Sequence, residues 1–93
     1  MSINRIRKAV RDGHYQYTIH ALDEMDADDL VEEDVRHALL HGDVVAELTE
    51  DPRGVRFVVQ GTGMLPLPII EVVCRFLPSG LLRLITVYAL EED

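Results

Sequence analysis

The chain of 93 residues has a single cysteine, Cys74, no tryptophan, and only five aromatic side chains. One cysteine excludes a disulfide bond within the chain and any zinc site built from cysteine pairs. So few aromatic residues also make a poor stacking surface for single-stranded nucleic acid. No apolar run is long enough to cross a bilayer, and the charged start MSINRIRKAV lacks the apolar stretch of a signal peptide. We therefore expect a cytoplasmic protein without a membrane partner.

The net charge of −8 is distributed unevenly along the chain. Residues 1–17 carry a balance of +3, residues 18–51 a balance of −11, and residues 52–93 a balance of zero. A chain with this excess of acids repels nucleic acid at long range, which disfavours RNA as a partner. The acidic middle segment instead suits a basic protein partner.

Apolar residues that recur on one helical face predict a first and a third helix. The first covers residues 2–11, with Ser2 as its cap. The third begins at Glu32 or Asp34 and ends at Gly42, which we expect in a left-handed conformation. Their buried faces should consist of Ile3, Ile6, Ala9 and Val10, and of Val35, Ala38 and Leu39, respectively.

A second helix is expected between these two, capped by Thr18. The spacing of Ile19, Leu22 and Met25 predicts that these three side chains face the core. His20 is then left at or near the surface.

Strands are predicted for the rest of the chain. Alternating apolar and polar residues indicate strands over 43–49 and 55–60, joined by a turn that contains proline and glycine. The stretch from Leu67 to Leu90 should form a β-hairpin with the turn Pro78-Ser79-Gly80, in which Gly80 is left-handed. Residues 14–17 form a further short extended segment. Together these elements predict a single α+β domain over residues 1–93, with the helices packed on one face of an antiparallel sheet of about four strands.

The hairpin turn predicts which residues face each other across the two strands. If Leu77 lies opposite Leu81, the opposed pairs are Arg75 with Arg83, Val73 with Ile85, and Glu71 with Val87. The other face is nearly all apolar and should face the core; it contains Ile70, Val72, Cys74, Phe76, Leu82, Leu84, Thr86, Tyr88 and Leu90. Cys74 is therefore expected to be buried and unreactive.

Several short segments recur in an order typical of one protein family. They are His20-Ala21 followed by Met25, the segment 31–35 with Ala38, Leu39 and Gly42, the segment 68–73, and the closing Ile85-Thr86-Val87-Tyr88. Over roughly residues 17–88, their order and spacing resemble the DUF4258 family of small bacterial domains, whose function is unassigned. In layout that family resembles the RelE-like toxins, and the analogy implies a ribonuclease or toxin-like activity. The chain departs from the family at Glu24, where arginine is common, and at a second such position within residues 26–29.

His20 and Glu24 are four residues apart on the predicted second helix, where their side chains can meet. A pair of this kind suits general base catalysis, with the carboxylate orienting the imidazole. The same spacing also fits a surface pair that adds only about a few tenths of a kcal/mol to stability. Both interpretations stay open.

Arg75 and Arg83, directly opposed across two strands, form the second candidate site. Like charges in this arrangement destabilise a sheet unless something compensates them. A bound anion such as phosphate would do so, and an acidic side chain of the chain itself is the alternative. Because the helices are expected on the apolar face, this site should be open and out of reach of Glu24.

His37 and His41 are also four residues apart, but the sequence offers neither a cysteine pair nor an HExxH pattern to complete a zinc site. Histidines in the last turns of a helix interact favourably with its dipole, which explains the pair without a metal. We expect no metal site and no cofactor.

These observations leave two functions. The first is a non-enzymatic protein-interaction module whose acidic helical surface binds a basic protein, and the excess of acids favours it. The alternative is a toxin-like ribonuclease in which His20 is the general base, Glu24 orients it, and Arg75 and Arg83 bind phosphate.

Overall fold

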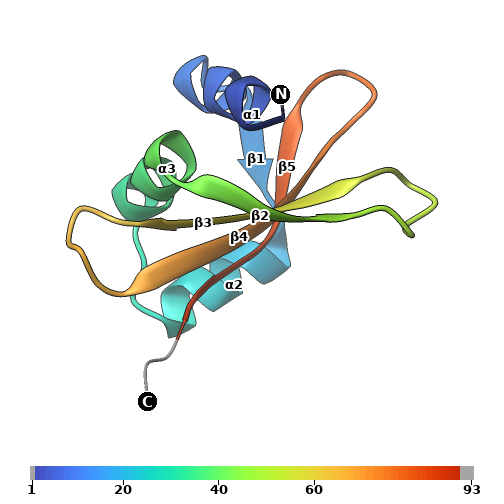
Figure 1. The fold of residues 1–93 in the computed structure, drawn as a ribbon. Coiled ribbons are helices and arrows are strands. Elements are labelled where there is room, and N and C mark those ends of the chain that lie inside the picture. Colours follow the sequence, from blue (N-terminus) through green and yellow to red (C-terminus); the bar gives the residue numbers. More distant parts are fainter. Residues whose placement is uncertain (1, 91–93) are drawn as a thin grey trace.

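The computed structural model describes residues 2–90 as three helices and five strands (Figure 1). The helices are α1 (Ser2–Arg11), α2 (Ile19–Ala27) and α3 (Glu32–His41). The strands are β1 (Tyr15–Tyr17), β2 (Asp43–Leu48), β3 (Arg56–Thr62), β4 (Ile69–Phe76) and β5 (Leu82–Ala89). No helix within residues 2–90 is both long and apolar enough to cross a membrane.

All five strands form one sheet in the order β1-β5-β4-β3-β2. Neighbouring strands run antiparallel, except that β1 lies parallel to β5, with Gln16 opposite Arg83. The predicted α+β class and mainly antiparallel sheet are confirmed, with one strand more than expected. The pairing of β1 has no local signal, because the strand has three residues and its partner lies near the other end of the chain.

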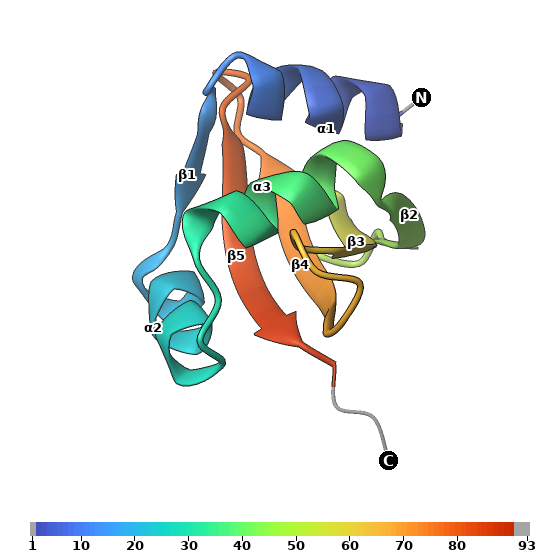
Figure 2. The ribbon, with the colours of Figure 1, turned by 90° about the vertical axis from the view of Figure 1, so that its left-hand side faces the viewer.

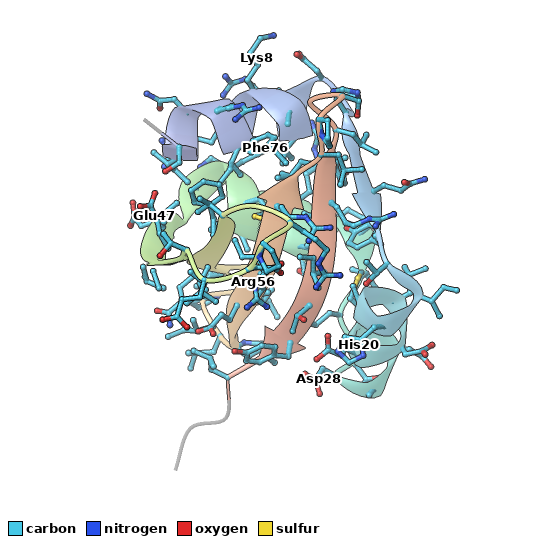
Figure 3. The ribbon with its side chains drawn as sticks, turned by 90° about the vertical axis from the view of Figure 1, so that its right-hand side faces the viewer. Lys8, His20, Asp28, Glu47, Arg56 and Phe76 are labelled. Carbon is cyan, nitrogen blue, oxygen red and sulfur yellow. The ribbon has the colours of Figure 1, made fainter. Side chains whose placement is uncertain are left out.

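The core lies between one face of the sheet, here called the covered face, and the helices (Figures 1 and 2). Helix α3 crosses this face over β3 and β4, α1 packs on α3, and α2 lies beside β5. No helix of residues 2–90 packs on the opposite face, here called the helix-free face (Figure 3). The fully buried side chains include Ile6, Leu39, Ile70, Val72, Leu82, Leu84 and Val87.

The predicted inner faces of α1 and α3 are confirmed except at Ile3, which is half-buried. Ala9 is buried, and the fully buried members are Ile6, Val10, Val35, Ala38 and Leu39. These side chains recur at the helical period, so they line one face of each helix. That face of α3 packs on the sheet, and α1 packs on α3.

The predicted inner face of α2 is wrong in two of its three residues. Ile19 is 79% exposed and Leu22 is 49% exposed, whereas Ala21 and Met25 are buried. His20 is exposed, as predicted. The difference arises because α2 packs beside the outer edge of β5, so its inner face contains Ala21, Met25 and the polar Glu24, which bonds to this edge.

Side chains of α2 and of its two capping residues, Thr18 and Asp28, satisfy the backbone of the β5 edge that β1 does not reach. Thr18 Oγ1 donates to the carbonyl oxygen of Ile85 at 2.9 Å. Farther along, Glu24 Oε1 accepts from the amide of Val87 at 3.1 Å, and Asp28 Oδ2 accepts from the amide of Ala89 at 2.8 Å. Unpaired groups on a sheet edge invite pairing with other chains, so α2 protects this edge as a further strand would.

The turn of the β4–β5 hairpin is as predicted. Leu77 N donates to the carbonyl oxygen of Leu81 at 2.8 Å, and Gly80 is left-handed with φ of 90°. Arg75 lies opposite Arg83, which confirms the first part of the predicted register.

Beyond Cys74 and Leu84 the predicted register is wrong, because a β-bulge adds one residue to β5. Cys74 lies opposite Leu84 while Val73 lies opposite Thr86, so Ile85 is the extra residue. The bulge reverses the alternation of side chains in the second half of β5. Thr86 and Tyr88 therefore lie on the helix-free face, opposite Val73 and Glu71, and Val87 and Ala89 face the core in their place.

Two glycines let α3 lie close to the sheet. Gly42 is extended (φ −83°, ψ −172°), so the predicted left-handed cap is wrong. A Cβ atom at Gly42 would clash with the carbonyl oxygen of Gln60, and one at Gly61 would lie 2.5 Å from the carbonyl oxygen of Ala38. Glycine is required here for close backbone approach.

Candidate functional site

Three arginines gather around one carboxylate on the helix-free face, and a fourth lies opposite one of them. Asp51, in the turn between β2 and β3, lies within ion-pair distance of Arg53, Arg56 and Arg75, and Arg83 lies opposite Arg75. We call these five residues the Asp51 cluster. Figure 3 shows Arg56 beside the β2–β3 turn on this face. Sequence reasoning found Arg75 and Arg83 but missed the other three, because only the folded turn brings them to β4.

The hydrogen bonds of Asp51 go to its neighbour in the turn. Its Oδ1 accepts from the backbone N of Arg53 at 2.9 Å and from Nε at 3.2 Å, and its Oδ2 accepts from Nη2 at 3.3 Å. Arg56 Nε and Arg75 Nη1 lie farther from Oδ2, at 3.6 and 3.8 Å. The side-chain and backbone hydrogen bonds from Arg53 hold the pKa of the Asp51 carboxyl below its ordinary value. Asp51 is therefore an anion at neutral pH.

The expectation that the Arg75–Arg83 site is open is wrong for Arg75. Its side chain is only 9% exposed, and that of Asp51 is 7% exposed. The turn that carries Asp51 folds over Arg75, and Gly54 of this turn lies beside its Cδ atom. The chain's own carboxylate, the alternative to a bound anion, is thus next to Arg75. That these two arginines bind an anion stays a prediction.

His20 and Glu24 meet on α2 as their spacing predicts. His20 Nε2 lies 3.2 Å from Glu24 Oε1, and the His20 side chain is 67% exposed. The same Glu24 oxygen accepts from the amide of Val87, which holds the carboxylate in place. The arrangement leaves Nδ1 of the imidazole free to accept a proton from a bound molecule.

The structure does not bring the two predicted sites into contact. Glu24 is anchored at Val87, in the second half of β5, whereas Arg83 lies in the first half. Four residues of a strand span roughly 13 Å. A single extended ligand would have to bridge the two sites.

A pocket that the sequence did not reveal lies between the α2–α3 connection and the β3–β4 connection. Its volume is about 260 Å³. Asp28, Asp29 and Asp34 contribute carboxylates, and we call it the acid-rimmed pocket. The apolar part of its lining consists of Leu30, Leu65, Leu67, Pro68 and Ile70. These residues come from separate segments, and the one local signal was the exposed leucines of the β3–β4 connection.

The three aspartates of this pocket differ in the hydrogen bonds that their carboxylates already accept. Asp28 accepts from the amide of Ala89, and Asp34 Oδ1 accepts from the amide of Met64 at 3.0 Å. Asp29 is exposed, in a left-handed conformation with φ of 55°. Asp29 is therefore the carboxylate best placed to meet a ligand.

A protein-family model described as "Domain of unknown function (DUF4258)" matches residues 17–89, which is most of the chain. The chain belongs to the DUF4258 family. No curated protein and no solved structure matches it. The DUF4258 match includes His20, Glu24, the Asp51 cluster and the acid-rimmed pocket, while α1 precedes it. The likeness to RelE-like toxins stays a prediction.

His37 and His41, the other candidate pair considered from the sequence, lie in the last turns of α3 of this DUF4258 domain. The rings of His37 and His41 are 4.5 Å apart between centroids, and His37 Nδ1 lies 2.8 Å from the carbonyl oxygen of Thr62. Because a carbonyl oxygen can only accept, Nδ1 carries a hydrogen in this contact. Within residues 2–90, no three histidine, cysteine or acidic side chains come together as a metal site would need.

Proposed function

We propose that this DUF4258 domain is a non-enzymatic interaction module that binds a basic segment of a partner protein in the acid-rimmed pocket. The observation that carries the proposal is the combination of an apolar lining with a carboxylate rim. An arginine or lysine side chain has the matching character, with an apolar stem and a charged end. Such a side chain could lay its stem against Leu65 and Leu67 and place its charge beside Asp29.

The surroundings of the pocket also suit a protein partner. Leu65 is 71% exposed and Leu67 is 52% exposed, so apolar side chains of the partner would find apolar surface beside the rim. The charge balance of −11 over residues 18–51 attracts a basic segment and speeds its encounter with the domain.

An NMR titration with a capped tripeptide, arginine between two leucines, tests the proposal. We expect amide shifts at Asp29, Leu30 and Leu65, because these residues line the pocket. A tripeptide with citrulline in place of arginine is the matched control, since citrulline keeps the shape and removes the charge. Binding should be about tenfold weaker for citrulline, as expected for a charge-assisted hydrogen bond made by arginine.

Two pairs of variants locate the binding site. Asp29→Asn and Leu65→Ser should each weaken binding of the arginine peptide, and asparagine tolerates the left-handed backbone at position 29. Their controls are Asp23→Asn and Met64→Ser, which change exposed residues outside the pocket lining. Equal loss of binding in a variant and its control would rule out the pocket as the site.

A second candidate is the toxin-like ribonuclease, which the contact between His20 and Glu24 supports. A ribonuclease that cleaves through the ribose 2′-hydroxyl needs a base that removes its proton while the 2′-oxygen attacks phosphorus. The bond to the 5′-oxygen breaks, and this oxygen takes a proton from water. His20 Nδ1 would take the proton of the 2′-hydroxyl, and Glu24 would keep the imidazole oriented. Arg75 and Arg83 would bind phosphate groups of the same strand.

Incubation of the purified protein with a fluorescently labelled RNA tests this candidate. His20→Ala should abolish cleavage, and His14→Ala, which removes another exposed histidine, should leave it unchanged. Cleavage that survives in His20→Ala, or its absence from the wild-type protein, would eliminate the ribonuclease.

A further inference from the structure

We propose that the Asp51 cluster is a phosphate-binding site in which the Asp51 carboxylate occupies the position of the phosphate until a ligand displaces it. The site is separate from the acid-rimmed pocket and uses none of its residues. A negative result for the interaction module would therefore leave this proposal unaffected, and the reverse also holds.

The arginines around Asp51 have more donors than its carboxylate can satisfy. A guanidinium has five N–H donors, yet Arg75 reaches Asp51 Oδ2 only at 3.8 Å although its side chain is nine-tenths buried. Arg56 Nε is buried and, among the described residues, has no hydrogen-bond partner; it lies 3.6 Å from the same oxygen. A buried donor without an acceptor costs free energy, so Arg56 Nε favours a ligand that supplies a further oxygen, and the long contact of Arg75 leaves room for one.

The neighbouring acids do not neutralise these charges. Asp51 is the one carboxylate within 4.0 Å of Arg53, Arg56 or Arg75 in residues 2–90, and none lies that close to Arg83 there. Glu71, on the same face, accepts hydrogen bonds from Tyr88 and Gln60. Glu47 and Glu50 share a groove with Arg56 but lie beyond ion-pair distance in the described structure.

Phosphate suits this site better than the carboxylate that occupies it. A phosphate group presents tetrahedrally arranged oxygens that can accept from several guanidinium groups at once. It would also compensate the repulsion between Arg75 and Arg83, which a long ion pair to Asp51 relieves only in part. Displacement of Asp51 would replace its hydrogen bonds to Arg53, in a turn whose residues 52–55 are exposed.

The test is an NMR titration with inorganic phosphate at an ionic strength kept constant with sodium chloride, repeated with a short oligouridylate. Asp51→Asn removes the competing charge and keeps an oxygen that can accept from the amide of Arg53. We expect it to bind phosphate about tenfold more tightly than the wild type, which corresponds to about 1.4 kcal/mol. Arg56→Gln should bind about tenfold more weakly than the wild type. Its matched control is Arg11→Gln, an exposed arginine of α1, which should change nothing.

Several results would overturn the proposal. They are equal affinities of the wild type and Asp51→Asn, no binding by either protein at tens of millimolar phosphate, or equal losses in Arg56→Gln and Arg11→Gln. If the oligouridylate binds more tightly than phosphate and Asp51→Asn strengthens both, the source of the phosphate is a nucleic-acid backbone. If phosphate binds as tightly as the oligouridylate, the ligand is a free phosphate or a small phosphate ester.

Discussion

The two faces of the sheet are stabilised by different means. On the covered face, Val72, Leu82 and Leu84 are fully buried under the helices, and their stability comes from apolar surface removed from water. On the helix-free face, cross-strand neighbours include charged and polar pairs: Arg75 faces Arg83, and Glu71 faces Tyr88. Charged and polar groups of this kind decide which ligands a surface attracts more than they stabilise the fold. The covered face therefore maintains the fold, and the helix-free face is where binding of charged ligands is expected.

The side chains of Cys74 and Tyr88 show the same difference between the two faces, in the causes of their raised pKa values. The pKa of each is raised to about 12, in Cys74 by burial and in Tyr88 first by its hydrogen bond to Glu71 and then by burial. Cys74 is on the covered face and Tyr88 on the helix-free face. The raised pKa of Tyr88 should therefore depend mainly on one partner, Glu71. The raised pKa of Cys74 depends on the whole core that surrounds it.

The largest expected effect compares a leucine of the covered face with a leucine on the outside of α2. Leu84→Ala, on the covered face, should lower the free energy of unfolding by about 2–5 kcal/mol, because it leaves a cavity in the core. Leu22→Ala, on the outer side of α2, should cost less than about 1 kcal/mol. Urea unfolding monitored by circular dichroism measures both. Equal losses would mean that α2 does not pack as described.

The next effect concerns the edge that joins the two faces. Glu24→Ala leaves the amide of Val87 without its acceptor and should cost about 1–3 kcal/mol. Glu24→Gln keeps an oxygen for this hydrogen bond and should cost less. Hydrogen exchange at the Val87 amide provides a local measurement, with acceleration expected in the alanine variant. Asp23→Ala, at an exposed neighbouring position, is the control, and acceleration there as well would contradict a specific role of Glu24.

The thiol of Cys74 should be protected by the core. Because burial raises its pKa above the ordinary value, the neutral thiol contributes stability below about pH 9 that is lost as the pH rises toward 12. A thiol reagent at pH 8 should label the native protein only as fast as it unfolds, and label the urea-unfolded protein at once. Rapid native labelling would show that this part of the covered face is accessible.

The smallest expected effect is the titration of Tyr88. Its hydrogen bond to Glu71 favours the neutral phenol, so the associated stability is present below about pH 10 and lost as the pH rises through 12. In Glu71→Gln the pKa of Tyr88 should fall toward its ordinary value. The ring resonances of Tyr88 followed by NMR against pH measure it. An unchanged pKa in the variant would assign the shift to burial and remove the contrast with Cys74.

Part of the fold and of the candidate sites could be predicted from local patterns. The inner faces of α1 and α3, the hairpin turn at Gly80, the opposition of Arg75 and Arg83, and the contact of His20 with Glu24 all appear in the structure. Each depends on residues within a few positions of one another or on one tight turn. The acid-rimmed pocket and three members of the Asp51 cluster could not be predicted, because their residues are distant in the chain.

The sequence by itself determined the class of the fold, the family, and the location of its acidic and basic segments. Helical period, strand alternation and turn chemistry act between near neighbours, so one chain is enough to reveal them. The tertiary structure decided the rest: β1 pairs with β5, α2 lies beside the β5 edge and exposes Ile19 and Leu22, and a bulge at Ile85 turns Tyr88 away from the core. It also folded Asp51 over Arg75. These features follow from hydrogen-bond and charge requirements of groups that meet only when the chain is folded.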